Sequence, residues 1–515
     1  MSPIDAGDSA LPARPDGRAP AEDGRRRWLV LAVIATAQLM VVLDGTVINI
    51  ALPSAQAALH FTNADRQWII TGYALAFGSL LLLGGKLGDL FGRKTTFVIG
   101  LAGFAVASAV GGASISFGML VTARVCQGVF GALLSPAGLS LLTTTFPDKK
   151  DRGVAFGIYG AIVGSGSAVG MILGGVLTEY FSWRWCLYIN LVFAAAGITG
   201  GMLLLRRERP AHRPRLDLPG TLAVSAAMFA LVYGFSNADT NGWHAPSTWG
   251  FLASGVVLLA SFVLLQAKVA NPLLPLRILR DRNRAGAYLA VFLMMAGGAG
   301  VFLFLTYYLQ ETLHYSAVST GLSYLPMLAT AMFAAIYSNL RLLPRFGPRP
   351  LVTLGMLLAA AGMVWLTRIT PESGYAATLL GPLLVTGAGT GMATAPSTNT
   401  ATFRLPTADA GVGSALANTQ QQIGQSIGTA LLNTLAVAAT THYLLTDHGA
   451  AGAAAIALAS VHGYTTAFWW AAAILAAGAV VCALLFRGGP LEAAGGPENA
   501  DAAILEAEIG SAIPN

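Results

Sequence analysis

Long apolar stretches follow one another along almost the whole chain, and they constrain its fold more than any other feature. A helix needs about 20 mostly apolar residues to cross the hydrocarbon core of a bilayer. Backbone polar groups find no water there, so stretches of this length indicate helices. The sequence predicts an all-α polytopic membrane protein with fourteen spans, at residues 28–52, 66–87, 96–117, 119–143, 153–177, 186–205, 217–236, 248–267, 285–309, 317–340, 351–368, 376–398, 411–437 and 465–486.

The charge content excludes a soluble protein. Only 10% of the 515 residues are charged and 55% are hydrophobic, whereas soluble domains carry about 25% charged residues. The net charge of +6 comes from cations that lie singly or in short clusters between apolar stretches. This pattern is typical of loops at a membrane surface. We therefore expect the lipid bilayer as a partner and no nucleic acid.

The positions of the cations predict the topology. With the N-terminus in the cytoplasm, 26 of the 30 Lys and Arg residues fall on the cytoplasmic side, and Arg66, Arg184 and Arg368 fall outside. Cytoplasmic loops of membrane proteins carry such an excess. We therefore predict a multi-pass protein of the cytoplasmic membrane with both termini inside. Residues 1–27 and 487–515 are expected to be disordered cytoplasmic tails.

A short sequence repeat suggests two halves. Phe91 to Lys94 after the second span reads Phe-Gly-Arg-Lys, and Phe346 to Arg349 after the tenth reads Phe-Gly-Pro-Arg. Repeated halves around a midplane site are the architecture of secondary transporters. We predict one six-helix bundle at residues 28–205, two inserted helices with flanking loops at 206–284, and a second six-helix bundle at 285–486.

Two ionisable residues lie inside predicted spans, where charge is costly and function is the default hypothesis. Asp44 lies in the first span, and we interpret it as a proton carrier. In the alternative, it only hydrogen-bonds the neighbouring backbone and orders its helix. Arg124 lies in the fourth span, where a fixed positive charge would tune a carboxylate. It is otherwise a structural residue that binds backbone carbonyls.

Four segments of the sequence carry a family resemblance when they are taken together. They are Leu43 to Pro53, Gly85 to Lys94, Arg124 to Gly128, and Trp183 to Trp185 followed by Ile189 and Asn190. These segments resemble the fourteen-helix drug:proton antiporters of the major facilitator superfamily (EmrB/QacA type). The resemblance covers residues 28–486 and implies the major facilitator fold, two six-helix bundles plus two inserted helices. It also implies proton-coupled export of drugs.

The second of these segments resembles the loop motif that in the superfamily stabilises the outward-facing state. Glycines would let the second helix approach a neighbour and allow a tight turn, and an acidic residue would pair with two cations at the cytoplasmic mouth. In the alternative, the cations only set the topology. Leu90 stands where the family often has Arg, so one contact is missing. The predicted cytoplasmic gate consists of Gly85, Asp89, Gly92, Arg93 and Lys94.

The fifth predicted span carries regularly spaced glycines that resemble the superfamily's antiporter motif. Small residues at every fourth position allow close helix packing, which is also the simpler explanation. Met171 follows Gly170, where the family has Pro, and this departure leaves strict antiport open. The glycines assigned to the motif are Gly164, Gly166, Gly170, Gly174 and Gly175.

Polar and aromatic residues within spans are candidates for a substrate cavity. The thirteenth predicted span is so polar that it must face protein or water. It contains no acidic residue, which disfavours a specialist for dications. The tyrosines among the candidates are equally explained as membrane-interface residues. The predicted cavity residues are Asn49, Tyr73, Gln127, Asn190, Tyr307, Asn418, Gln421 and Gln422.

The sequence contains no motif for metal binding, nucleotide binding or catalysis. Three cysteines and seven histidines show no metal-ligand spacing, and no nucleotide-binding loop or nucleophile motif occurs. We expect no metal, no cofactor and no enzyme activity, and a monomer. The predicted function is proton-coupled efflux of amphipathic small molecules by alternating access. The alternatives are a metabolite or siderophore exporter or a facilitator without strict antiport, and, more remotely, a sensor or membrane enzyme.

Overall fold

The structure is a computed structural model that describes residues 20–63, 65–146, 149–205, 217–269, 272–403, 405, 407–446 and 453–489. Most of the two predicted tails and of the loop after the sixth span therefore lies outside the described residues. The described part is helical and contains no strand.

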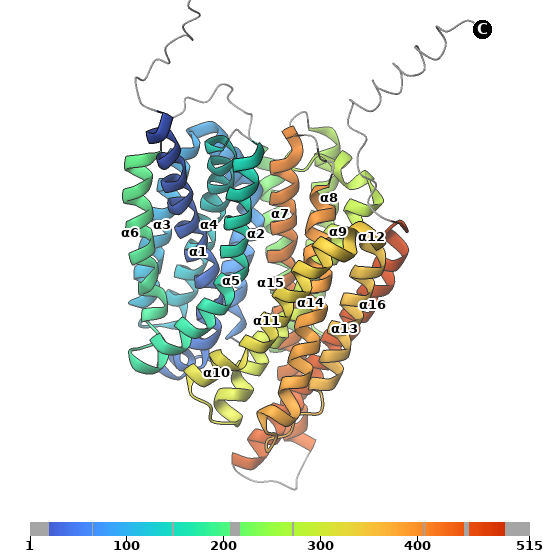
Figure 1. Ribbon diagram of the computed structural model, residues 1–515. Coiled ribbons are helices and arrows are strands. Elements are labelled where there is room, and N and C mark those ends of the chain that lie inside the picture. The colour runs from blue at the N-terminus through green and yellow to red at the C-terminus, as the bar shows by residue number, and fades with distance from the viewer. Residues whose placement is uncertain are drawn as a thin grey trace, which may run out of the picture.

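Helices α1 to α6 form the first half of the molecule, drawn in blue to green on the left of Figure 1. They are α1 (Pro20–Leu59), α2 (Gln67–Phe91), α3 (Arg93–Gly112), α4 (Phe117–Thr145), α5 (Lys149–Tyr180) and α6 (Trp185–Leu204). Two helices and a short 3-10 turn follow. They are α7 (Leu218–Asn241), α8 (Pro246–Lys268) and η1 (Leu276–Arg280).

The second half, drawn in yellow to red, contains several shorter helical segments joined end to end. They are α9 (Arg282–Tyr307), η2 (Tyr308–Thr312), α10 (Ala317–Ser323), α11 (Leu325–Tyr337), η3 (Ser338–Leu342), α12 (Leu343–Phe346), α13 (Pro348–Leu366), η4 (Tyr375–Leu379), α14 (Leu380–Thr402), α15 (Thr407–Thr446) and α16 (Ala453–Leu485).

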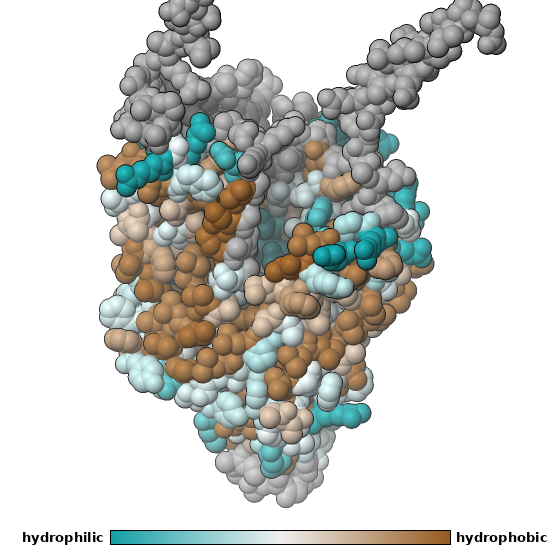
Figure 2. Space-filling model, in the orientation of Figure 1, coloured by the Kyte–Doolittle hydropathy of each residue, from teal (hydrophilic) through white to brown (hydrophobic). Residues whose placement is uncertain are grey.

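The described helices agree with the predicted spans. Eleven are long and apolar enough to cross a membrane, and α2, α5 and α15 supply the other three of the fourteen predicted spans. Helix α15 is the polar thirteenth span, and it packs against α2, α7, α9 and α16. Figure 2 shows a broad apolar band across the face in view, with hydrophilic residues towards its two ends, as expected for a membrane protein.

The tenth predicted span is not one continuous helix. Helix α10 ends at Ser323, and α11 begins at Leu325 with Pro326 in its first turn. Proline has no N–H to donate and clashes with the preceding turn, so it interrupts a helix or starts a new one. The span therefore exists but is kinked at Tyr324, and a π-helical turn, η3, extends its far end.

Corresponding tight turns support the division into two halves. Gly92 joins α2 to α3 with φ 90°, and Gly347 joins α12 to α13 with φ 74°. Positive φ favours glycine, so the two similar sequences adopt similar backbone conformations. Helix α7 packs against α2 of the first half and α15 of the second, and α8 packs on α7. The inserted pair therefore covers the joint between the halves on one side.

Candidate functional site

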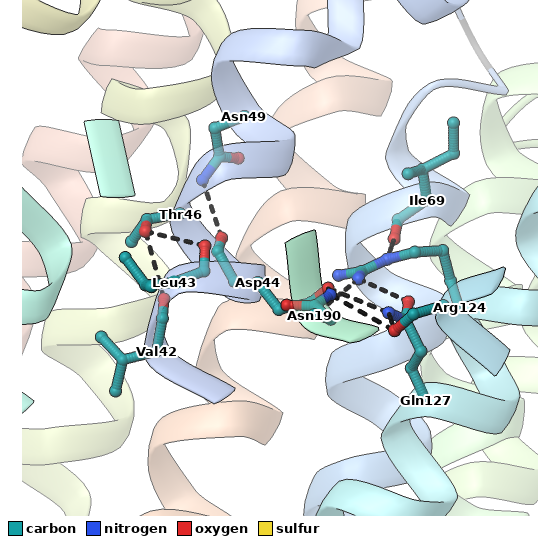
Figure 3. A network of polar contacts seen from close by, with 11 residues as sticks. Val42, Leu43, Asp44, Thr46, Asn49, Ile69, Arg124, Gln127 and Asn190 are labelled. Carbon is teal, nitrogen blue, oxygen red and sulfur yellow. Dashed lines mark hydrogen bonds and ion pairs between the residues drawn. The ribbon is translucent and has the colours of Figure 1, made fainter. Parts of the chain in front are cut away.

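Asp44 lies in the middle of α1 with 2% of its surface exposed, and three side-chain donors converge on its carboxylate. Arg124 Nη1 donates to Oδ2 at 2.5 Å, Gln127 Nε2 donates to Oδ1 at 2.9 Å, and Asn190 Nδ2 donates to Oδ1 at 2.7 Å. Figure 3 shows these contacts. A buried charge that is paired and hydrogen-bonded in this way fits the ionised form of the carboxylate.

Arg124 joins three helices through one guanidinium group. Besides Asp44 on α1, its Nε donates to the carbonyl oxygen of Ile69 on α2 at 3.1 Å. Its Nη1 also donates to Gln127 Oε1 at 2.8 Å, one turn along α4. The Tyr73 ring of α2 lies 4.4 Å from the guanidinium carbon. The spacing of three residues places Arg124 and Gln127 on one face of α4, so the sequence itself brings these two donors together.

Ser108 of α3 completes the polar network. Its hydroxyl oxygen accepts from Gln127 at 2.7 Å and from Asn190 at 3.3 Å. The network therefore links α1, α2, α3, α4 and α6 inside the first half. Only the Oδ1 of Asn190 lacks a partner among these atoms. The sequence analysis did not identify Ser108, because a serine within an apolar span carries no distinctive signal.

The glycines of α5 pack it tightly against α1 beside this network. A Cβ on Gly170 would clash with the Thr46 hydroxyl, and a Cβ on Gly174 would lie 3.0 Å from the Val47 carbonyl oxygen. Further along, a Cβ on Gly175 would lie 2.7 Å from the Ala317 carbonyl oxygen of the second half. Gly166 packs in the same way against α1, while Gly164 lies outside the described side chains. These glycines of α5 therefore allow close packing against α1 and α10.

Arg66, which the sequence places on the outer side of the membrane, is 2% exposed at the start of α2. Its Nε donates to Asn433 Oδ1 of α15 at 3.0 Å. Its guanidinium carbon lies 4.3 Å from the Tyr307 ring centre and 5.6 Å from that of Phe304, both on α9. The guanidinium therefore bridges the two halves. Residue type alone gave no sign of this burial, since arginine next to a span end usually faces water.

Further hydrogen bonds join the halves at the same end of the molecule. Tyr307 donates to Gln56 at 2.5 Å, and Gln310 donates to the Ile50 carbonyl oxygen at 3.0 Å. The Val318 amide donates to the Glu179 carboxylate at 2.8 Å. We call these bonds, together with the Arg66 contacts, the outer contact. Figure 2 shows the surface hollowed between the halves towards the opposite end of the molecule.

The predicted cytoplasmic gate is only partly described. Gly92 forms the expected tight turn, and Lys94 Nζ donates to the carbonyl oxygens of Met202 at 2.8 Å and Leu205 at 2.6 Å, at the end of α6. The side chain of Asp89 lies outside the described residues.

The glycine at which α2 approaches α4 most closely is Gly84, which lies just before the predicted gate residues. A Cβ on Gly85 would lie 3.7 Å from Pro136, an ordinary contact, and a Cβ on Gly88 would meet nothing within 4 Å. At Gly84 it would clash with the Ala132 carbonyl oxygen of α4. The helix surface turns by about 100° per residue, so neighbouring glycines face different partners, and the motif alone did not indicate which one faces α4.

The predicted cavity residues divide into two groups. Gln421 is exposed, and Asn418 and Gln422 are partly buried, all on α15. The other five are buried; four of them form hydrogen bonds, and the Tyr73 ring lies against the Arg124 guanidinium. The five are Asn49, Tyr73, Gln127, Asn190 and Tyr307. The described residues contain no group of side chains suited to a metal ion.

Comparison with known proteins places the chain in a family. The family model of the Major Facilitator Superfamily matches residues 34–429. The chain belongs to the major facilitator superfamily. This result confirms the resemblance drawn from the motifs, and it makes the chain a membrane transporter rather than an enzyme.

Curated relatives match along most of the chain. The puromycin resistance protein pur8 of Streptomyces alboniger is 48% identical over 445 residues, which are 86% of this chain and 88% of that protein. The tetracenomycin C resistance and export protein of Streptomyces glaucescens is 37% identical and covers 80% of this chain and 76% of its own length.

Solved structures confirm the fold. The POT family transporter PepTSo superimposes with a TM-score of 0.65 at 14% identity, covering 90% of this chain and 97% of that chain. A bacterial homologue of the human lysosomal transporter Spinster, in an inward-facing and unoccupied conformation, has a TM-score of 0.60 at 16% identity, covering 91% and 98%.

Proposed function

We propose that the chain exports amphipathic antibiotic-like compounds across the cytoplasmic membrane in exchange for protons. Two of the relatives above are named for resistance to, or export of, antibiotics, and their similarity extends over most of the transmembrane region. The observation that carries the proton coupling is the buried Asp44 carboxylate with its three donors.

Asp44 is the proposed proton carrier. The Arg124 guanidinium stays protonated at any physiological pH, so the exchangeable proton of this pair belongs to the carboxylate. Protonation of Asp44 removes the charge that attracts Arg124 and leaves a carboxyl group that itself donates a hydrogen bond. A change of this kind alters the contacts among the helices that carry the network, as coupling of proton binding to a conformational change requires.

The proposed orientation places both termini in the cytoplasm and the outer contact at the extracellular side. In this conformation the halves are joined outside, and a substrate would arrive from the cytoplasmic side. Alternating access would then separate the outer contact while the opposite ends of the halves approach. Asn418, Gln421 and Gln422 of α15 are the proposed polar lining of the substrate path, and the remaining predicted residues act within the Asp44 network and the outer contact.

A transport assay tests the coupling. Everted vesicles from cells that lack their own drug exporters receive an imposed pH gradient, and uptake of a fluorescent amphipathic substrate is followed. We expect Asp44→Asn to abolish gradient-driven uptake, because the amide cannot bind the proton. Asp281→Asn is the matched control. Asp281 is the N-cap of α9, and asparagine caps helices equally well. Gradient-driven uptake by Asp44→Asn at the wild-type rate would exclude Asp44 as the carrier.

The second candidate is a facilitator without obligatory exchange. Met171 in the position of the family's proline favours it, because methionine keeps the backbone N–H and does not kink the helix as proline does. The residue is fully buried, and its carbonyl oxygen lies against Gly321 of α10. Measurement of proton release from the purified protein on substrate addition separates the two candidates. Release of protons supports antiport, and binding of substrate without release supports facilitation.

A further inference from the structure

The outer contact contains a buried guanidinium without a bound carboxylate. In the described part of the chain no carboxylate oxygen lies within ion-pair distance of Arg66, and its Nη1 has no hydrogen-bond partner. Its neighbours are the Asn433 amide and the rings of Tyr307 and Phe304. Tyr464 and Glu311 also lie close enough to interact with it electrostatically. Burial of an incompletely paired charge is unfavourable, so this contact is poised to open when something shifts it.

The same turn of α2 is held by the Asp44 network. Arg124 donates to the carbonyl oxygen of Ile69, which lies three residues after Arg66. Both residues belong to the first turn of α2, because a helical turn contains 3.6 residues. Arg124 therefore contacts this turn from inside the first half. Arg66, which belongs to the same turn, contacts the second half.

We propose that Arg66 is the positioning residue that transmits the protonation state of Asp44 to the outer contact. When Asp44 binds a proton, Arg124 loses its counter-charge and relaxes its hold on the Ile69 carbonyl oxygen. The first turn of α2 then shifts, Arg66 leaves Asn433 and the aromatic rings, and the halves separate outside. The inference rests on the proposed role of Asp44 as the proton carrier.

This sequence of events gives the exporter a direction. The outer contact is closed while Asp44 is paired with Arg124, and it opens when the carboxylate is protonated. The outward-open state then binds the proton more tightly than the closed state, by the reciprocity of linked equilibria. A proton therefore enters from outside and leaves after the outer contact closes, as exchange against an exported substrate requires.

Distance measurements between spin labels test the inference. Ile115 and Leu445 are exposed at the outer ends of the two halves, at 85% and 73%. Labelled cysteines at these positions, in a protein whose native cysteines are replaced by alanine, report separation of the halves. We expect acidification to raise the population with the longer distance by at least about fivefold, the lower end of usual site-to-site coupling.

Variants separate the roles of the two residues. Arg66→Gln is expected to lose the response to acidification, and the matched control Arg368→Gln, an exposed outer arginine, is expected to keep it. Asn433→Leu removes the acceptor from the other half and is expected to act like Arg66→Gln, so the test stands even if one variant does not fold. A wild-type response in both Arg66→Gln and Asn433→Leu would overturn the inference.

Asp44→Asn and Glu311→Gln identify the proton site. If Asp44→Asn loses the response to acidification while Arg66→Gln and Asn433→Leu keep it, only the proposed role of Arg66 is wrong. Retention of the response in Asp44→Asn defeats the proposed proton carrier itself. If Glu311→Gln alone abolishes the response, the titrating group is the carboxylate near Arg66, and the link through Arg124 and Ile69 is wrong. Other groups close to the network are Tyr73 and Cys186, and neither forms the ion pair with Arg124.

Discussion

At the scale of single residues, Arg124 shows why this position calls for arginine. Its Nη1 contacts Asp44 and Gln127 while its Nε contacts the Ile69 carbonyl oxygen, and the plane of the group lies against Tyr73. Lysine carries the same charge on a compact ammonium and cannot reproduce this arrangement. The position therefore depends on the shape of the guanidinium as well as on its charge.

We predict that Arg124→Lys destabilises the protein by about 3 kcal/mol, since it breaks a buried paired network. The apparent melting temperature of the detergent-solubilised protein checks this prediction. Arg368→Lys, which makes the same replacement at an exposed position, is expected to leave the melting temperature unchanged. Equal melting temperatures for Arg124→Lys and wild type would mean that charge alone is required.

The sequence predicts those residues of the site whose types are rare inside membranes. Asp44 and Arg124 stand out because ionisable residues in spans are few, and the structure brings them together. The Ile69 carbonyl oxygen could not be predicted, because every residue has one. The burial of Arg66 could not be predicted either, because it depends on partners more than 200 positions further along the chain.

At the scale of helices, the close packing of α2 and α4 depends on Gly84. The backbones approach so closely there that a single Cβ would overlap the Ala132 carbonyl oxygen of α4. Backbone atoms cannot rotate away as a side-chain end can, so one of the helices has to move. Gly88, one turn further along α2, faces open space.

We predict opposite effects of alanine at these two positions. Gly84→Ala is expected to destabilise the protein by about 1–3 kcal/mol, the usual range for overpacking. Gly88→Ala is expected to be neutral or to stabilise by up to about 1 kcal/mol, since alanine favours a helix over glycine. Thermal unfolding of the two purified variants measures both effects. A stable Gly84→Ala protein would show that α2 and α4 separate readily.

The sequence predicted the existence of the helices better than their continuity. Apolar length located most of the spans, because the bilayer fixes how long a spanning helix must be. Eleven of the described helices meet this criterion, and α2, α5 and α15 are not among them. The break at Tyr324 could not be located in advance, since a proline inside an apolar stretch either kinks a helix or begins the next one. Which of these occurs depends on how the chain packs around Pro326.

At the scale of the whole molecule, the two halves meet at the outer contact through α1, α2 and α5 of the first half and α9, η2, α10 and α15 of the second. The inserted pair covers a different part of the joint. Trp68 of α2 lies against Tyr233 of α7 with ring centres 6.2 Å apart, and Thr434 of α15 donates to the Phe235 carbonyl oxygen of α7. Trp68 therefore packs against the inserted pair.

If the halves move as proposed, a covalent link across the outer contact must stop transport. Glu179 of α5 and Val318 of α10 already meet through a hydrogen bond of 2.8 Å, so cysteines at both positions lie within reach of a short bifunctional thiol reagent. In the protein without native cysteines, we expect the linked Glu179→Cys/Val318→Cys protein to lose gradient-driven uptake and to regain it when a cleavable link is reduced. Each single variant treated with the same reagent is the control. Alternating access requires the outer ends to separate once in every cycle. Uptake at the unlinked rate by fully linked protein would therefore show that substrate leaves by a route that does not open this contact.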